Sequence, residues 1–305
     1  MTLQAAALGG ARSRWMNRAS RHRLALASAV FLIALAALSA LAPTLAHWLA
    51  IDPSDVDLYH RFAPASAQHW LGTDELGRDG RMRLLCGGRV SLAVGMMVAV
   101  VAAIIGTAIG LPAGDFGGRL DAVLMRVTDG MIALPLLPLL VVLAAVDLSK
   151  LGLPQWAVLS ESVDFYRIVA IIALVGWTTV ARLVRGAALT LRETTFVRAA
   201  EAVGASGWRI MTRHILPNVA SPVIVATTLS IGNVILFESV LSFLGLGIQP
   251  PVSSWGNMLT DAQELVWTDP ALAIYPGLFI FATVIAFNFL GDGLQDALDP
   301  RAGSR

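Results

Sequence analysis

Long apolar stretches alternate with short polar segments along the whole chain. A helix needs about 17–25 apolar residues to cross the roughly 30 Å hydrocarbon core of a bilayer. Six stretches approach or reach that length, and they are 24–42, 90–113, 127–146, 168–184, 221–244 and 271–290. The pattern predicts an all-α membrane protein with six transmembrane helices.

Composition strengthens this prediction and excludes other classes of protein. Of the 305 residues, 56% are hydrophobic and 14% are charged, and the mean hydropathy is +0.70. A soluble domain carries about 25% charged residues, so this chain has too few to coat a soluble surface. A net charge of +1 gives no field that would attract a nucleic acid. Because Cys86 is the only cysteine, an intrachain disulfide and a cysteine-based metal cluster are excluded.

The distribution of arginine and lysine predicts the orientation of the spans. With the N-terminus inside, the inner segments hold fifteen of these residues and the outer segments hold seven. Because such residues favour the cytoplasmic side, we expect both termini in the cytoplasm. A cleaved signal peptide is the alternative for the first span, since a basic N-terminus precedes it and Ala40-Leu41-Ala42 ends it. Its apolar run of 19 residues is longer than a signal peptide usually has.

Small residues and prolines inside the spans bear on helix packing. Pro135 and Pro138 in the third span and Pro276 in the sixth lack backbone donors, so we expect kinks there. Such kinks are expected either in a bundle with an internal pathway or as passive bends in a structural bundle. One face of the second span suits either packing within this chain or contact with another subunit. Its small residues are Gly95, Ala99, Ala102, Gly106 and Gly110.

The longest inner loop, 185–217, has the pattern of two short helices joined by a turn. The first is predicted over 196–203, where four apolar residues share one face: Phe196, Ala199, Ala200 and Val203. Gly204 permits the turn, and a second short helix from Ser206 is expected to end before Pro217. Such an element suits docking by a partner protein. The six arginines between positions 182 and 213 equally suit contact with anionic lipid headgroups.

The same loop resembles a motif of a known protein family. Ala199-Ala200-x-x-x-Gly204, followed after ten residues by Ile215-Leu216-Pro217, is similar to the EAA loop of binding-protein-dependent ABC importer permeases. Arg198 stands where that family has glutamate, and Glu201 lies one turn further on. The resemblance implies a loop that docks on a cytoplasmic ATPase through Arg198, Ala199, Ala200, Glu201, Gly204, Ala205, Ile215, Leu216 and Pro217.

Further segments resemble the dipeptide, oligopeptide and nickel branch of this family. Residues 69–79 are similar to its H-x-L-G-T-D-x-x-G-R-D signature. Residues 241–247 and 254–259 resemble the exit of its fifth span and the loop that follows, and residues 291–301 resemble its C-terminal end. The resemblance covers roughly residues 20–301 and points to the second of the two permease types in this branch.

The resemblance implies a MetI-like type I ABC importer permease in the bacterial inner membrane, which moves di- or oligopeptides by alternating access. Nickel or another small solute of the same branch is the alternative substrate. The implied partners are a second permease subunit, two cytoplasmic ABC ATPases, a periplasmic substrate-binding protein and the lipid bilayer, with no nucleic acid. The implied parts are a cytoplasmic N-terminal tail (1–23), a first transmembrane helix (24–42) and a periplasmic loop (43–89). A core permease domain with five transmembrane helices (90–291) and a cytoplasmic C-terminal tail (292–305) follow.

Groups for energy coupling or catalysis are missing from this chain. A P-loop needs the pattern G-x-x-x-x-G-K-[ST], yet the only lysine, Lys150, is followed by Leu151. We therefore expect ATP and Mg²⁺ on separate ATPase subunits, and no cofactor, metal or catalytic residue here. Neither H-E-x-x-H nor G-x-S-x-G occurs, which disfavours an intramembrane enzyme.

One carboxylate in the fifth span leaves two interpretations open. Glu238 lies near the predicted outer end of that span, and ionisable groups at membrane depth commonly mark function. It would either line a substrate pathway or serve as a structural hydrogen-bonding group. A pathway role for Glu238 would suit a proton-coupled secondary carrier, which is the alternative to an ABC importer permease.

Overall fold

The computed structural model describes residues 23–147, 162–260, 267 and 269–298. Within these residues, five helices are long and apolar enough to span a membrane, and a bent pair of helices adds a sixth if it counts as one span. The predicted all-α membrane fold is therefore confirmed. The five long helices are α2 (Arg23–Leu49), α3 (Gly80–Phe116), α7 (Val163–Arg192), α10 (Leu216–Phe243) and α12 (Ala271–Leu298).

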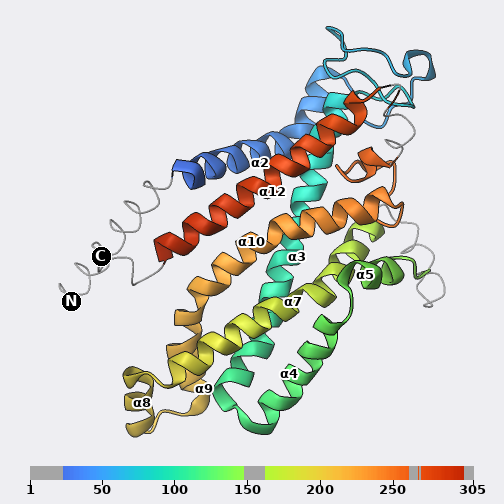
Figure 1. Ribbon diagram of the computed structural model, residues 1–305. Helices are drawn as coiled ribbons and strands as arrows, with labels where there is room; N and C mark the ends of the chain where they lie inside the picture. The colour runs from blue at the N-terminus through green and yellow to red at the C-terminus, as the bar shows by residue number, and fades with distance from the viewer. Residues whose placement is uncertain (1–22, 148–161, 261–266, 268, 299–305) are drawn as a thin grey trace.

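Helix α3 is the centre of the bundle, because it packs against α2, α7 and α10. Helix α12 joins α2 to α10, and α2 and α12 run side by side (Figure 1). Leu32 and Leu35 of α2 belong to the same buried cluster as Ile280 and Phe287 of α12. The first and last of these long helices therefore pack against each other through a shared core.

The third span differs from the single kinked helix that was predicted over 127–146. The structure has two helices there, α4 (Gly118–Ala133) and α5 (Leu136–Ala144), which meet at 85°. Leu134, between them, is extended with ψ of 135°, because the ring of the following proline disfavours the helical conformation. Pro138 causes no second break, since it lies in the first turn of α5, where no backbone donor is needed.

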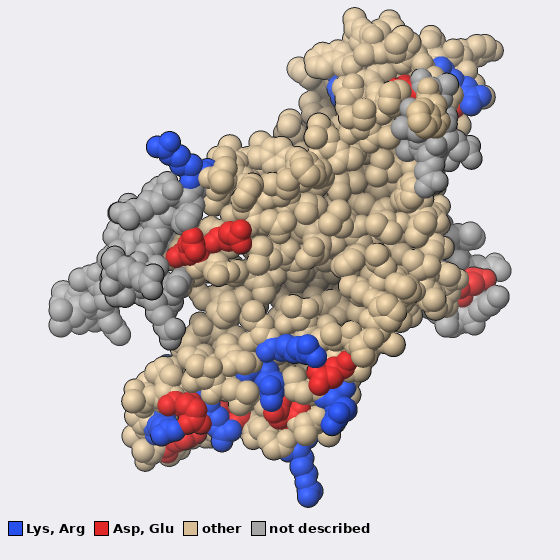
Figure 2. Space-filling view, viewed as in Figure 1, with Lys and Arg blue, Asp and Glu red and all other residues tan. Residues whose placement is uncertain are grey.

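Charged side chains gather at two opposite ends of the bundle, and the middle of the face in view is largely free of charge, with a few charged groups at its left and right edges (Figure 2). One end holds helix α8 (Thr195–Ala202) and the link from α3 to α4 (Figure 1). The other end holds the loop from α2 to α3, which contains the short helix η1 (Leu58–His60). An uncharged band between two charged ends is the arrangement expected of a protein that spans a bilayer.

Several helices extend past the boundaries that hydropathy predicts: α2 runs to Leu49 and α12 to Leu298. In α3 and α7 the extension includes charged residues that are paired or cap the helix. Helix α3 begins at Gly80 rather than near 90, and the Asp79 carboxylate caps it by accepting the Met82 N–H at 2.9 Å. Helix α7 continues to Arg192 rather than ending near 184. The predicted loops 43–89 and 185–217 are therefore partly helical, and both boundaries are corrected.

Paired charges in α7 explain why its helix continues through arginines. The Arg182 guanidinium donates to the Asp129 carboxylate at 2.6 Å, and the Arg185 guanidinium donates to the Asp121 carboxylate at 2.6 Å. Both aspartates belong to α4. These pairs fasten α4 to α7 at the end of the bundle that holds α8.

The small-residue face of α3 packs inside the subunit. A β-carbon on Gly106 would lie 2.7 Å from the carbonyl oxygen of Trp177 in α7, and one on Gly95 would lie 2.9 Å from the side chain of Ile235 in α10. Such distances leave no room for a side chain. Of the two interpretations of this face, the structure supports packing within the chain.

Candidate functional site

The predicted turn at Gly204 is confirmed, and it ends helix α8. Gly204 has a φ of +86°, which L side chains rarely adopt. Its N–H donates to the Glu201 carbonyl at 2.9 Å, and the Ala205 N–H donates to the Ala200 carbonyl at 3.0 Å. These two bonds form a Schellman motif, which satisfies carbonyls at the helix end and reverses the chain. Helix α9 (Gly207–Ile210) follows directly.

A buried valine anchors α8 to the rest of the subunit. Val197 is fully buried, together with Ile210 and Ile215, against Val184 and Ala188 of α7. Hydrophobic periodicity missed Val197, because it lies one position beyond the predicted apolar face. Ala200, Ala205 and Leu216 pack partly buried at the edge of this cluster.

The predicted apolar face of α8 points away from the core of the subunit. Phe196 is 43% exposed and Val203 is 89% exposed, and Ala199 is also exposed. Trp208 of α9, which sequence analysis did not single out, is 69% exposed. Trp208 lines a pocket with Ile104 and Leu111 of α3. Exposed large apolar side chains such as these commonly mark contact with a partner or a membrane.

Charged residues accompany this exposed apolar face. Arg198 is exposed and forms an ion pair with Glu193, which is also exposed. Glu201 is exposed on the same helix. Arg198, which replaces the glutamate of the family motif, therefore presents a guanidinium at the surface.

The expected break before Pro217 is wrong, because the helix continues through this residue. Residues 207–243 form one helical segment, in which α9 passes through a π-helical turn, η3 (Met211–Ile215), into α10. The Leu216 N–H donates to the Met211 carbonyl, which is the bond of a π turn. The wider turn accommodates Pro217, whose ring would crowd the preceding turn of an ordinary helix.

A large cavity lies among α4, α5, α7, α10 and the end of α12. Its volume is about 1190 Å³, and Pro217 lines it near the start of α10. The residues that line it are apolar or carry uncharged polar groups. The polar ones are Thr178, Thr179, Asn218, Ser221, Ser230, Asn233 and Gln295.

Glu238 does not line this cavity; its carboxylate connects α3, α10 and the loop that follows α10. Its side chain is fully buried, and its carboxylate accepts the hydroxyls of Ser91 at 2.9 Å and Ser242 at 2.7 Å. The same hydroxyls accept backbone N–H groups, that of Trp255 at 3.2 Å and that of Ile248 at 3.0 Å. The carboxylate therefore fixes the loop after α10 onto α3 and α10, which is a structural role.

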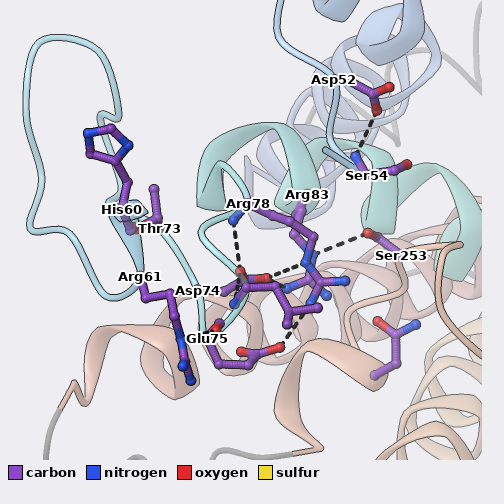
Figure 3. A network of polar contacts seen from close by, with 12 residues as sticks. Asp52, Ser54, His60, Arg61, Thr73, Asp74, Glu75, Arg78, Arg83 and Ser253 are labelled. Atoms are coloured by element: carbon purple, nitrogen blue, oxygen red, sulfur yellow. Dashed lines mark hydrogen bonds and ion pairs between the residues drawn. The ribbon is translucent and has the colours of Figure 1, made fainter. Parts of the chain in front are cut away.

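Paired charges hold together the loop before α3 (Figure 3). The Asp74 carboxylate accepts Arg78 Nε at 2.7 Å and also pairs with Arg83, and all three residues are buried. Arg78 also donates to Glu75 at 2.9 Å. Arg83 Nε reaches the Ser253 hydroxyl at 3.4 Å, which links this loop to the one after α10. Two arginines of the predicted outer segments, Arg78 and Arg83, are thus paired with carboxylates that precede α3.

Within the described residues, no group of three or more histidine, cysteine, aspartate or glutamate side chains could hold a metal ion. Lys150, on which the argument about the P-loop rests, lies outside the described residues. So do most of the N-terminal tail and the last seven residues, 299–305.

Comparison with known proteins gives the family. Residues 106–304 match the family described as binding-protein-dependent transport system inner membrane component. A probable D,D-dipeptide transport system permease protein of Escherichia coli strain K12 is 38% identical over 297 residues, which cover 97% of this chain and 93% of the relative. A glutathione transport system permease protein of Pectobacterium atrosepticum is 40% identical over 288 residues, which cover 94% of this chain and 90% of the relative.

A nickel transport system permease protein of Escherichia coli strain K12 is 39% identical over 285 residues, which cover 93% of this chain and 97% of the relative. All three relatives are named as transport permeases and not as enzymes. With its apolar helices, the chain is a multi-pass inner-membrane component of a transporter complex with other subunits. The chain belongs to the family of binding-protein-dependent transport system inner membrane components, and it is a permease subunit of an ABC importer of the peptide and nickel branch.

Proposed function

We propose that this permease works with a second permease subunit, two cytoplasmic ABC ATPases and a periplasmic substrate-binding protein to import di- or oligopeptides. Both termini lie in the cytoplasm, and the ATPases bind ATP and Mg²⁺. Residues 195–210, which comprise α8, Gly204 and α9 and are called the coupling element below, dock on an ATPase subunit.

One observation carries this proposal, which is the continuity between the coupling element and the cavity. The helical segment 207–243 begins in the coupling element and continues into α10, whose residues line the cavity from Pro217 to Phe237. No loop interrupts this path. A displacement of the coupling element is therefore passed along the helix to the wall of the cavity.

The exposed surface of the coupling element supports a protein partner. Phe196, Val203 and Trp208 expose apolar area, and removing such area from water contributes about 25 cal/mol for each Å², which offsets part of the cost of association. Membership of the permease family favours an ATPase over lipid headgroups as the partner. Val197 and the buried residues around it hold the element in place, so that it can transmit force.

Alternating access follows from two such chains facing each other. The cavity forms one half of a pathway, and the second permease supplies the other half. When ATP binds, the two ATPases close and draw the two coupling elements together. The α10 helices then rock, and the pathway changes from inward-facing to outward-facing so that the binding protein can deliver its solute.

The lining of the cavity supports a peptide more than a bare cation as the solute. A peptide group needs hydrogen-bond donors and acceptors, which the hydroxyl and amide groups of the lining supply. A metal ion is held best by imidazole, thiolate or carboxylate ligands. Nickel nevertheless remains the second candidate, because one relative with 39% identity is named a nickel permease.

Uptake by reconstituted complexes with the cognate binding protein tests the substrate. Vesicles receive radiolabelled dialanine, glutathione or nickel chloride, and uptake is compared with and without ATP. The proposal predicts ATP-dependent uptake of a peptide that exceeds uptake of nickel. Uptake of nickel alone would contradict the peptide assignment and favour the second candidate.

A further inference from the structure

Asn233 places an amide group on the exposed face of α10, in the middle of the membrane-spanning part of the chain. It lies ten residues before the end of α10, and it is exposed and lines the cavity. Its neighbours along the helix, Ile231, Val234 and Ile235, are buried apolar residues. Asn233 is thus a polar position within an apolar stretch.

Some of the other polar groups of the cavity form hydrogen bonds to their own helices. The Ser230 hydroxyl donates to the Thr227 carbonyl at 2.8 Å. The Thr178 hydroxyl donates to the Val175 carbonyl at 3.1 Å. Such bonds to a carbonyl three or four residues earlier remove the need for an outside partner.

The Asn233 amide has no such bond. Among the described residues, its side chain makes no hydrogen bond. Thr179 of α7 is also exposed, lines the same cavity and lacks a partner among the described residues. An amide without a partner is costly in hydrocarbon, because lipid offers neither donors nor acceptors. Asn233 therefore needs water or a polar ligand in the assembled transporter.

We propose that Asn233, with Thr179 across the cavity, contacts the peptide groups of the transported solute at mid-membrane. The amide of Asn233 donates and accepts hydrogen bonds at once, as a peptide group does, so the two are complementary. The Thr179 hydroxyl provides a second contact from α7. The contact does not require a particular solute side chain, which suits a pathway whose selectivity resides in the binding protein.

This inference rests on the proposed function, and a labelling experiment separates the two. Cys86 is the only native cysteine, so a Cys86→Ala background allows one thiol to be placed at will. Asn233→Cys is compared with Ile224→Cys, which lies nine residues earlier on the opposite face of α10, is 51% exposed and does not line the cavity. The probe is sulfonatoethyl methanethiosulfonate, a charged reagent that reacts with hydrated thiols.

In the assembled complex with its ATPases, we expect Asn233→Cys to react at least tenfold faster than Ile224→Cys. Slow labelling of Asn233→Cys in the complex, together with fast labelling in the isolated chain, would place the residue in a contact with the second permease and overturn the inference. Equal, slow labelling in both would place it in lipid and overturn the inference as well. Neither readout depends on the identity of the solute.

Transport then tests contact with the solute itself. Asn233→Leu removes the amide, and Thr228→Ala is the control, because Thr228 lies on the same helix outside the cavity lining and its hydroxyl already donates to the Ile224 carbonyl at 2.9 Å. For whichever of dialanine, glutathione and nickel chloride the unaltered complex takes up, we expect Asn233→Leu to lower uptake per ATP hydrolysed at least tenfold. Thr228→Ala should stay within twofold. Unchanged uptake by Asn233→Leu would overturn the contact, whereas uptake of nickel alone would refute only the peptide substrate.

Discussion

A β-carbon on Gly110 would lie 2.3 Å from the carbonyl oxygen of Ala181. This is far shorter than a van der Waals contact, so α3 and α7 approach backbone to backbone at this point. Close approach of this kind is how small residues hold membrane helices together, since lipid provides no hydrophobic drive for their association. The contact between α3 and α7 is thus specified by the absence of a side chain.

Gly110→Ala is therefore expected to destabilise the subunit. Overpacking of a tight contact typically costs about 1–3 kcal/mol, and the neighbouring atom is backbone that cannot move aside. Thermal unfolding of the detergent-purified complex measures the effect. The control is Gly186→Ala in α7, where an added β-carbon meets nothing within 4 Å, and where alanine favours the helix by about 1 kcal/mol. Equal melting temperatures for the two variants would contradict the packing described.

Asp74→Ala is expected to destabilise the loop between α2 and α3 strongly. It would leave the buried guanidinium groups of Arg78 and Arg83 without the carboxylate that they share. Removing one partner from a buried ion pair typically costs about 3–5 kcal/mol, since a charge stays buried without compensation. Limited proteolysis of the complex in vesicles reports on the loop.

Arg198→Ala is the matched control for Asp74→Ala. It breaks the exposed pair with Glu193, and exposed pairs contribute about 0–1 kcal/mol. Protease resistance of the loop between α2 and α3 should therefore stay unchanged in this variant. Comparable resistance of both variants would show that the buried network contributes little.

Glu238→Leu is expected to loosen the loop that follows α10. The hydroxyls of Ser91 and Ser242 would lose their shared acceptor in a buried site, and each unsatisfied group typically costs about 1–3 kcal/mol. Glu238→Gln keeps one carbonyl acceptor and should lie between the wild type and Glu238→Leu in thermal stability. If Glu238→Gln kept wild-type stability but lost proton-dependent uptake, Glu238 would instead belong to a proton pathway.

Gly204→Val is expected to abolish binding of the ATPases while the chain still inserts into the membrane. The φ of +86° strains an L residue by about 1–2 kcal/mol, and a β-branched side chain tolerates it least. Gly204→Asn is the control, because asparagine adopts this conformation more readily and no atom lies within 4 Å of the added β-carbon. Co-purification of the ATPases measures the outcome. Full ATPase binding by Gly204→Val would contradict the assignment of the coupling element as the docking site.

The apolar pattern predicts where the membrane helices lie better than where they end. Hydropathy ends a span at the first charges, yet Arg182 and Arg185 continue α7 because aspartates of α4 neutralise them. Such pairs join residues more than fifty positions apart and are invisible to a local pattern. The same limit hides the start of α3, where Asp79 caps the helix.

Local rules also predict some turns correctly and others wrongly. Gly204 acts as expected, because the left-handed conformation is a property of that one residue. Pro135 was expected to kink a helix, and it separates two helices by 85° instead. Pro217 was expected to end a helix, but a π turn carries the helix past it. Whether a proline breaks a helix depends on how neighbouring turns and helices accommodate it, which the sequence alone does not specify.

The site was likewise predictable only in part. The motif around Gly204 located the coupling element, but the anchor Val197 and the exposed Trp208 fall outside the predicted apolar face. Asn233 gives no signal in the sequence beyond one polar residue in an apolar run. Its significance depends on the cavity, which is formed by helices that are far apart along the chain.

Solute uptake by reconstituted vesicles tests the central claim most directly. One set of vesicles holds this chain with the second permease and both ATPases, and is supplied with the loaded binding protein. Another set holds this chain alone under a proton gradient. The account predicts uptake only in the first set, and only with ATP. Uptake by the chain alone, driven by the proton gradient and indifferent to ATP, would contradict it.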